Sequence, residues 1–164
     1  RDEWSHLGLP DENYHDSRWS LPLAWLFFFE AANLMDLPAE ETGDRQLKFT
    51  SDAEQALDRF AQRRELLQAC VGEHVEPKQL DDLHHGVADR TGRYLLLDPE
   101  EIFSTMPDDQ AAHIDRLRAV FGAIAAENAA EVRAAAMPYC DPGAATVDDP
   151  AGHLLGYTYW PSQS

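Results

Sequence analysis

One stretch of the chain concentrates the residue types that could bind a metal ion. Its members are His74, Asp81, Asp82, His84 and His85, and Cys70 stands four residues before the first of them. Histidine nitrogens and carboxylate oxygens are ligands of transition-metal sites, where the metal activates water for hydrolysis. Adjacent histidines on a helix, however, point about 100° apart, and neither H-E-x-x-H nor H-x-H occurs. We therefore favour histidines at the surface or at the edge of the core, with a metal-assisted hydrolase as the alternative.

The chain shows no signature of nucleophilic catalysis or of phosphate binding. It lacks G-x-S-x-G, and Cys70 and Cys140 lie in no recognisable nucleophile motif. Its glycines form no phosphate-binding loop, and a D-x-D-x-D-G calcium loop is missing. We therefore expect no cofactor. The two cysteines have no C-x-x-C spacing, which predicts a reduced, cytoplasmic protein, with one long-range disulfide between them as the alternative.

Neighbouring acidic residues recur along the chain, and some have a local explanation. Glu100–Glu101 and Asp108–Asp109 stand at the starts of predicted helices, where carboxylates accept bonds from free amides and complement the helix dipole. Other acidic residues, in segments 36–44 and 73–82, have no such explanation. We predict that the partner-binding residues are among these: Glu40, Glu41, Asp44, Glu73, Glu76, Asp81 and Asp82.

The charge balance of the chain excludes two classes of partner. Thirty acidic residues against thirteen basic ones give a net charge of −17. The resulting negative field repels nucleic-acid phosphates and anionic membrane surfaces, and the arginines form no separate basic patch. A basic protein partner is compatible with this charge. The competing explanation is a biased composition, as in GC-rich genomes or salt-adapted proteins.

The most apolar stretch is LPLAWLFFF, residues 21–29. It is less than half as long as the stretch of about 20 residues that a bilayer-spanning helix needs, and no basic region of a signal peptide precedes it. We predict a central, buried helix from Leu21 to about Met35, capped by Ser20, with Pro22 in its first turn. An exposed anchor for a partner is the alternative for the aromatic residues.

Hydrophobic spacing and capping residues predict the remaining elements. We expect helices from Ser51 to about Cys70, from Pro77 through Val87, from Asp98 to before Pro107, and from Asp108 or Asp109 to about Ala136. We expect strands over 46–50 (at a sheet edge), 93–97 and 154–160, and no regular pattern over 1–19. The predicted fold is α+β, a single domain over 1–164. It has four to five helices packed on a small, mainly antiparallel sheet.

Three short blocks carry a resemblance to known proteins. They are WSLPL at 19–23, YLLLD at 94–98 followed by Glu101–Ile102, and LGYTYW at 155–160. In these blocks the chain resembles small uncharacterised bacterial proteins, some of which are found near toxin systems. Each block is a strand or the entry to a helix, so the resemblance implies an architecture and assigns no functional residue.

Taken together, these patterns favour a non-enzymatic, cytoplasmic, acidic binding protein. We expect a bacterial immunity or inhibitor protein that neutralises a basic toxin, since an acidic surface would match the phosphate-binding cleft of a nuclease and would speed association. Two alternatives stay open. One is the metal-assisted hydrolase, and the other is an accessory or scaffold subunit that holds its partner through residues 21–29.

Overall fold

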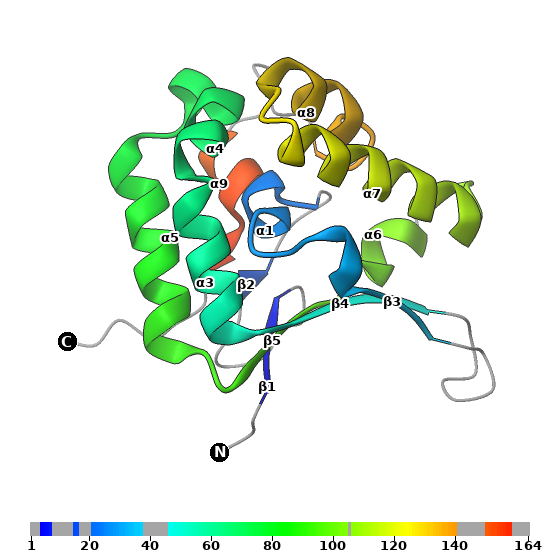
Figure 1. Ribbon diagram of the computed structural model, residues 1–164, viewed down its shortest axis with the longest axis horizontal. Helices are drawn as coiled ribbons and strands as arrows, with labels where there is room; N and C mark the ends of the chain where they lie inside the picture. The colour runs from blue at the N-terminus through cyan, green and yellow to red at the C-terminus, as the bar shows by residue number, and fades with distance from the viewer. Residues whose placement is uncertain are drawn as a thin grey trace.

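The computed structural model describes residues 4–7, 15–16, 21–37, 46–104, 106–140 and 150–158. These residues form an α+β fold in which the helices gather on one side of a sheet (Figure 1). The strand order in the sheet is β3-β4-β5-β1-β2-β6. The strands are β1 (Trp4–Leu7), β2 (His15–Asp16), β3 (Leu34–Leu37), β4 (Gln46–Asp52), β5 (Tyr94–Leu97) and β6 (Tyr157–Thr158).

Antiparallel pairing dominates the sheet, as the sequence predicts. Strands β3, β4 and β5 pair antiparallel, and so do β2 and β6, whereas β1 runs parallel to both β5 and β2. The prediction that residues 46–50 form an edge strand is wrong, because β3 pairs with β4 on its outer side. The absence of strands from residues 1–19 is also a wrong expectation. Strands β1 and β2 pair with segments distant in sequence, so local periodicity does not reveal them.

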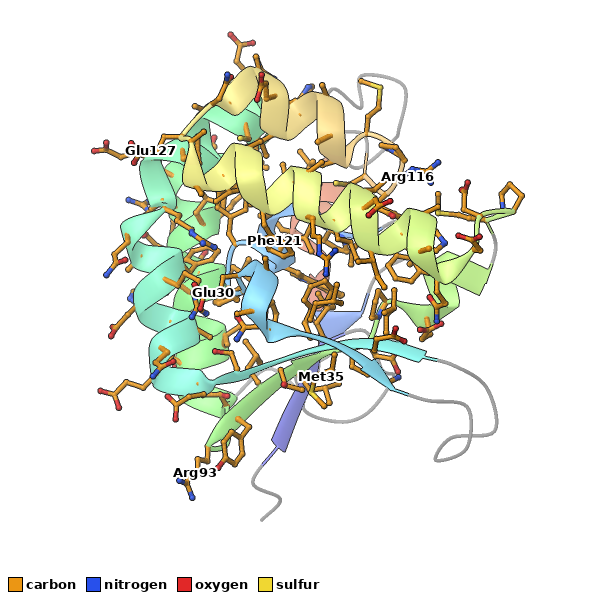
Figure 2. The ribbon with its side chains drawn as sticks, turned by 45° about the vertical axis from the view of Figure 1, so that its right-hand side comes forward. Glu30, Met35, Arg93, Arg116, Phe121 and Glu127 are labelled. Carbon is orange, nitrogen blue, oxygen red and sulfur yellow. The ribbon has the colours of Figure 1, made fainter. Side chains whose placement is uncertain are left out.

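Alternation along β4 and β5 decides which face of the sheet meets the helices. Leu47, Phe49, Leu95 and Leu97 are fully or almost fully buried under the helices. The residues between them are only half-buried, as expected for successive side chains that point to opposite faces. Figure 2 shows Met35 of β3 on the face away from the helices.

Several of the helices begin at residues whose side chains cap them. They are α1 (Leu23–Leu26), α3 (Ala53–Gln62), α4 (Arg64–Val71), α5 (Pro77–Arg90), α6 (Glu100–Ser104), α7 (Gln110–Ala125), α8 (Ala129–Ala136) and α9 (Pro150–Leu155), with 3₁₀ turns η1 (Ala31–Asn33) and η2 (Gly72–His74). The Asp109 carboxylate accepts from the Ala112 amide at the start of α7, as predicted. Asp52, one residue after the predicted cap, accepts from the Gln55 amide and begins α3.

Two of the predicted long helices are each divided in two. The helix expected from Ser51 to Cys70 breaks at Arg63 into α3 and α4. The helix expected to end near Ala136 breaks after α7, where Glu127 adopts a φ of 54° and the Asn128 side chain accepts from the Glu131 amide to start α8. The hydrophobic spacing continues across both breaks, so the pattern alone predicts one helix where the structure has two.

The apolar stretch 21–29 forms the centre of the core, but not as the predicted helix. Every residue in it is buried, and each of the eight residues other than Pro22 is at most 1% exposed, which excludes the exposed-anchor alternative. Only Leu23–Leu26 is α-helical, and the chain then turns into η1 and β3. The turn lets consecutive rings reach different elements. The Phe28 ring stacks on Phe60 at 4.4 Å, and the Phe29 ring lies 5.6 Å from Phe49. None of the described helices is long and apolar enough to cross a membrane.

Helix α9 closes over Trp25 at the other end of the core. The Trp25 indole donates to the Leu155 carbonyl at 2.8 Å. Gly156 follows with a φ of 80°, and a Cβ there would lie 2.3 Å from a ring carbon of Trp25, so only glycine fits. The strand predicted over 154–160 is therefore wrong at its start, since Leu154 and Leu155 end α9 and β6 covers only Tyr157–Thr158. Residues 159–160 lie outside the described ranges.

Candidate partner-binding surface

The acidic residues predicted to bind a partner fall into two groups. Glu40, Glu41 and Asp44 lie outside the described residues. The other four lie around the start of α5. Of these, Glu73 and Glu76 are exposed, so a partner could reach both. The Glu76 amide donates to the Gln79 side chain at 2.8 Å and thereby helps to begin the helix.

Asp81 and Asp82 have partners within the chain. The Arg64 guanidinium lies 2.9 Å from Asp81 Oδ1, and Lys78 Nζ lies 2.9 Å from Asp82 Oδ2. The hydrogen bond that Lys78 donates to Asp82 raises the pKa of Lys78, which keeps the Lys78 ammonium group charged at neutral pH. The expectation that these two acids have no local role is therefore wrong. Their charge is largely offset before any partner arrives.

The histidines do not converge on a metal site. His84 Nε2 lies 3.2 Å from the Leu57 carbonyl, and the His84 ring packs on Phe60 at 5.7 Å. His85 is exposed, because side chains of adjacent residues on a helix point in different directions. Within the described ranges, no group of three histidine, cysteine or acidic side chains could hold a metal ion.

The two cysteines are both buried. Cys70 Sγ lies 3.9 Å from the Ala129 carbonyl, whereas Cys140 Sγ points to the Ala136 carbonyl at 3.4 Å. Burial raises the pKa of Cys70 to about 11, so its reactive thiolate is scarce at neutral pH. The alternative of a disulfide between them is not realised in this structure.

An open pocket of about 320 Å³ lies between α3 and the turn that follows α1. Its lining residues are Glu30, Gln55, Asp58, Arg59, Gln62 and Arg63. Figure 2 shows Glu30 on the side of the molecule that carries α3. We call this feature the α3 pocket.

Two arginines form the inner wall of the α3 pocket. Arg59 Nη1 donates to the Phe28 carbonyl at 2.7 Å, and Arg63 Nη1 donates to the carbonyls of Phe29 at 2.5 Å and Phe27 at 3.4 Å. These carbonyls need a donor because the chain leaves the helical path at residue 27 and the turn is buried. Desolvation, and then repulsion from Arg59, lower the pKa of Arg63 to about 10, so the Arg63 guanidinium stays charged at neutral pH. We call this arrangement the arginine clamp.

Acidic and amide groups form the outer rim of the α3 pocket. Glu30 is 51% exposed, and its Oε1 lies 3.6 Å from Arg59 Nη2. Gln55, Asp58 and Gln62 are exposed. Among the described residues, the Asp58 carboxylate has no hydrogen-bond or ion-pair partner.

The described basic side chains are almost all engaged within the chain. Besides the arginine clamp and the two pairs on α5, Lys48 pairs with Asp98, Arg116 with Asp108, Arg133 donates to the Ala69 carbonyl, and Arg93 lies over the Tyr94 ring. In the same part of the chain, several exposed acids form no ion pair: Glu54, Asp58, Glu65, Glu73, Asp115 and Glu131. Most of the charged side chains in the described part of the chain that remain available to a partner are therefore negative.

A second buried polar cluster joins α6, α7 and the turn after α8. His113 is 1% exposed, its Nδ1 lies 2.9 Å from Tyr139 Oη, and its ring stacks on Phe103 at 4.2 Å. His113 Nε2 is buried and has no partner among the described residues. Desolvation lowers the pKa of His113 and raises that of Tyr139 to about 12. We call this arrangement the His113 cluster.

Sequence reasoning missed both the α3 pocket and the arginine clamp. The available signal was the four-residue spacing of Arg59 and Arg63, which places both side chains on one face of a helix. The carbonyls that they bind belong to a turn that the pattern predicts as helix. Comparison of the chain with family models, with curated proteins and with solved structures gave no match.

Proposed function

We propose that this protein is a non-enzymatic binding protein whose acidic surface captures a basic protein, in the manner of an immunity protein that neutralises a toxin. One observation carries the proposal: among the described side chains, nearly every cation is used internally while many acids are exposed and unpaired. A partner approaching this surface meets a field of one sign. Such a field speeds the encounter with a basic protein and repels acidic ones.

The two alternatives gain no support from the described residues. A metal-assisted hydrolase would need His74, Asp81, Asp82, His84 and His85 to share an ion. Instead, Asp81 and Asp82 pair with cations, and His84 turns to a backbone carbonyl. A scaffold that grips its partner through residues 21–29 would need that stretch at the surface, where it is not.

Capture at two salt concentrations tests the proposal. The immobilised protein is exposed to lysate from its natural host at low salt, and the captured species are identified by mass spectrometry. We expect a basic protein that binds in a one-to-one complex, whose affinity falls steeply as salt is raised. The captured protein should also lose its own activity when the complex forms. An acidic partner, or an affinity that is indifferent to salt, would contradict the proposal.

A charge-matched pair of variants sharpens this test. Neutralising the unpaired acids, as in the double variant Glu54→Gln/Asp58→Asn, should slow association. Neutralising both paired acids, as in Asp81→Asn/Asp82→Asn, removes the same formal charge and should slow it less, because Arg64 and Lys78 already offset those carboxylates. Equal slowing by the two double variants would mean that only the net charge matters.

A further inference from the structure

We propose that the His113 cluster is an acid-sensitive latch: when His113 takes up a proton, α6 and the turn at Tyr139 separate from α7 while the rest of the fold stays in place. In Figure 1, α6 lies on one side of α7 and α8 on the other. The ring of His113, on α7, contacts Phe103 of α6 and Tyr139, which follows α8. The latch does not depend on which partner the acidic surface binds.

The neutral imidazole of His113 suits its surroundings better than the charged one. His113 is 1% exposed, and its Nδ1 lies 2.9 Å from Tyr139 Oη, so a neutral ring can donate to that hydroxyl or accept from it. The buried Nε2 has no partner in the described part of the chain. Protonation turns both nitrogens into donors, so one N–H of the charged ring would lack an acceptor. An unpaired charged donor in the interior costs more free energy than an unpaired neutral group.

The ionisable groups around His113 do not remove this cost. The acidic side chains that attract its proton each bind another group: Asp108 binds the Arg116 guanidinium, Asp109 the Ala112 amide, and Glu100 the Leu47 amide. Desolvation therefore outweighs their attraction, and repulsion by Arg116 adds to it, so the pKa of His113 stays below its ordinary value. Tyr139 stays neutral in acid, because desolvation raises its pKa to about 12.

The contacts that depend on the His113 ring belong to one end of the molecule. Phe103 stacks on this ring at 4.2 Å, and its helix α6 has only five residues, too few to be stable without packing. The Tyr139 carbonyl accepts from the Leu21 amide at 3.0 Å, so displacement of the turn also frees that amide. The arginine clamp lies on α3, and the pKa of Arg63, about 10, keeps it charged in mild acid. We therefore expect acid to open α6 and the turn at Tyr139 first.

Amide hydrogen exchange, followed by NMR at several pH values between 7 and 5, tests the latch. The probes are the amides of Phe103 and Leu21, which donate to carbonyls in the cluster region, and the reference is the Leu67 amide, which donates to the Arg63 carbonyl at 2.9 Å. Protection factors correct for the intrinsic effect of pH on exchange. The open state binds the proton with the ordinary pKa of about 6.5 and the closed state with a lower one. Protection of the probes should therefore fall below about pH 6.5, by up to about tenfold for each pH unit, while Leu67 keeps its protection.

Two variants locate the response. His113→Phe keeps a ring beside Phe103 but cannot take up a proton, so its probe amides should show the same protection at pH 7 and at pH 5. His85→Gln removes a histidine that is exposed on α5 and should respond to acid as the wild type does. The comparison uses the change with pH, so a different protection at neutral pH does not affect it.

An NMR titration of the His113 ring in the wild type supplies a second readout that needs no variant. Proton uptake by this ring should accompany the loss of probe protection. Proton uptake while Phe103 and Leu21 stay protected would overturn the latch. So would equal losses of protection at Leu67 and at the probes, since the opening would then be global, or an acid response in His113→Phe that matches the wild type.

Discussion

The arginine clamp and the His113 cluster both contain buried polar groups, but they differ in how many of these groups have a hydrogen-bond partner. In the clamp, the carbonyls of Phe27, Phe28 and Phe29 each meet a guanidinium nitrogen. In the His113 cluster, Nδ1 meets the Tyr139 hydroxyl, while the buried Nε2 has no partner among the described residues.

This difference predicts different responses to substitution and to pH. Hydrogen bonds from a charged donor are about twice as strong as neutral ones, and the pKa of Arg63, about 10, keeps the clamp charged through the neutral range. The clamp should therefore be strong and insensitive to pH near neutrality. The His113 cluster rests on a neutral imidazole whose pKa is lowered by desolvation, so it should be weaker and sensitive to acid.

The largest effect should follow from Arg63→Met. This change keeps much of the side-chain volume but leaves the carbonyls of Phe27 and Phe29 without the donor, which should lower the free energy of unfolding by about 3 kcal/mol. Urea denaturation measures it. Arg118→Met, at an exposed position of α7, is the control and should change stability by less than about 0.5 kcal/mol. Equal effects of the two changes would show that the clamp does not stabilise the turn.

A smaller loss should follow from Tyr139→Phe in the His113 cluster. The variant keeps the ring but removes the hydroxyl that lies 2.9 Å from His113 Nδ1, leaving that nitrogen buried without its partner. We expect the free energy of unfolding to fall by about 1–2 kcal/mol. The same variant tests the raised pKa of Tyr139, about 12. Because Tyr139 should ionise only near pH 12, the tyrosinate absorbance of the variant should match that of the wild type up to about pH 11. A smaller rise in absorbance near pH 10 in the variant than in the wild type would contradict the raised pKa.

The smallest effect should be the pH dependence that His113 contributes. Its folded-state pKa lies below the usual 6.5, because desolvation outweighs the attraction of Asp108, while repulsion by Arg116 adds to the lowering and Glu100 and Asp109 oppose it. The unfolded chain then binds the proton more readily, so stability falls as the pH drops below about 6.5 and levels off below the folded-state pKa.

His113→Phe isolates this contribution. The variant keeps a ring stacked on Phe103 and removes the titrating group. Urea denaturation at several pH values between neutrality and mild acid should show a shallower decline for the variant than for the wild type. Parallel curves would mean that His113 does not titrate differently in the folded and unfolded states.

Several features follow from local sequence signals and are confirmed in the structure. Helix starts at Pro77 and after Asp109, the helix end near Cys70 and the strand ending at Leu97 all depend on one or two neighbouring residues. The burial of 21–29 follows from its composition alone. The α+β class with a mainly antiparallel sheet could also be predicted, because these local signals indicate both helices and strands.

The predictions that are wrong concern features that depend on contacts between distant segments. The predicted helix from Leu21 to Met35 is wrong because Phe28 and Phe29 pack against Phe60 and Phe49. Strands β1 and β2 exist only through pairing with β5 and β6. The pairing of the acidic residues also depends on distant segments. The ion pair between Asp81 of α5 and Arg64 of α4 joins two helices, so the sequence pattern does not predict it.

The sequence by itself determined the charge, the apolar centre and the points where several helices begin and end, because composition and capping act within a few residues. Only the tertiary structure decided which charged side chains form ion pairs or hydrogen bonds within the molecule and which remain available to a partner. That decision rests on which side chains meet across helices. In this protein the turn at Phe27–Phe29 and the arginines of α3 meet in that way, and the α3 pocket lies where they do.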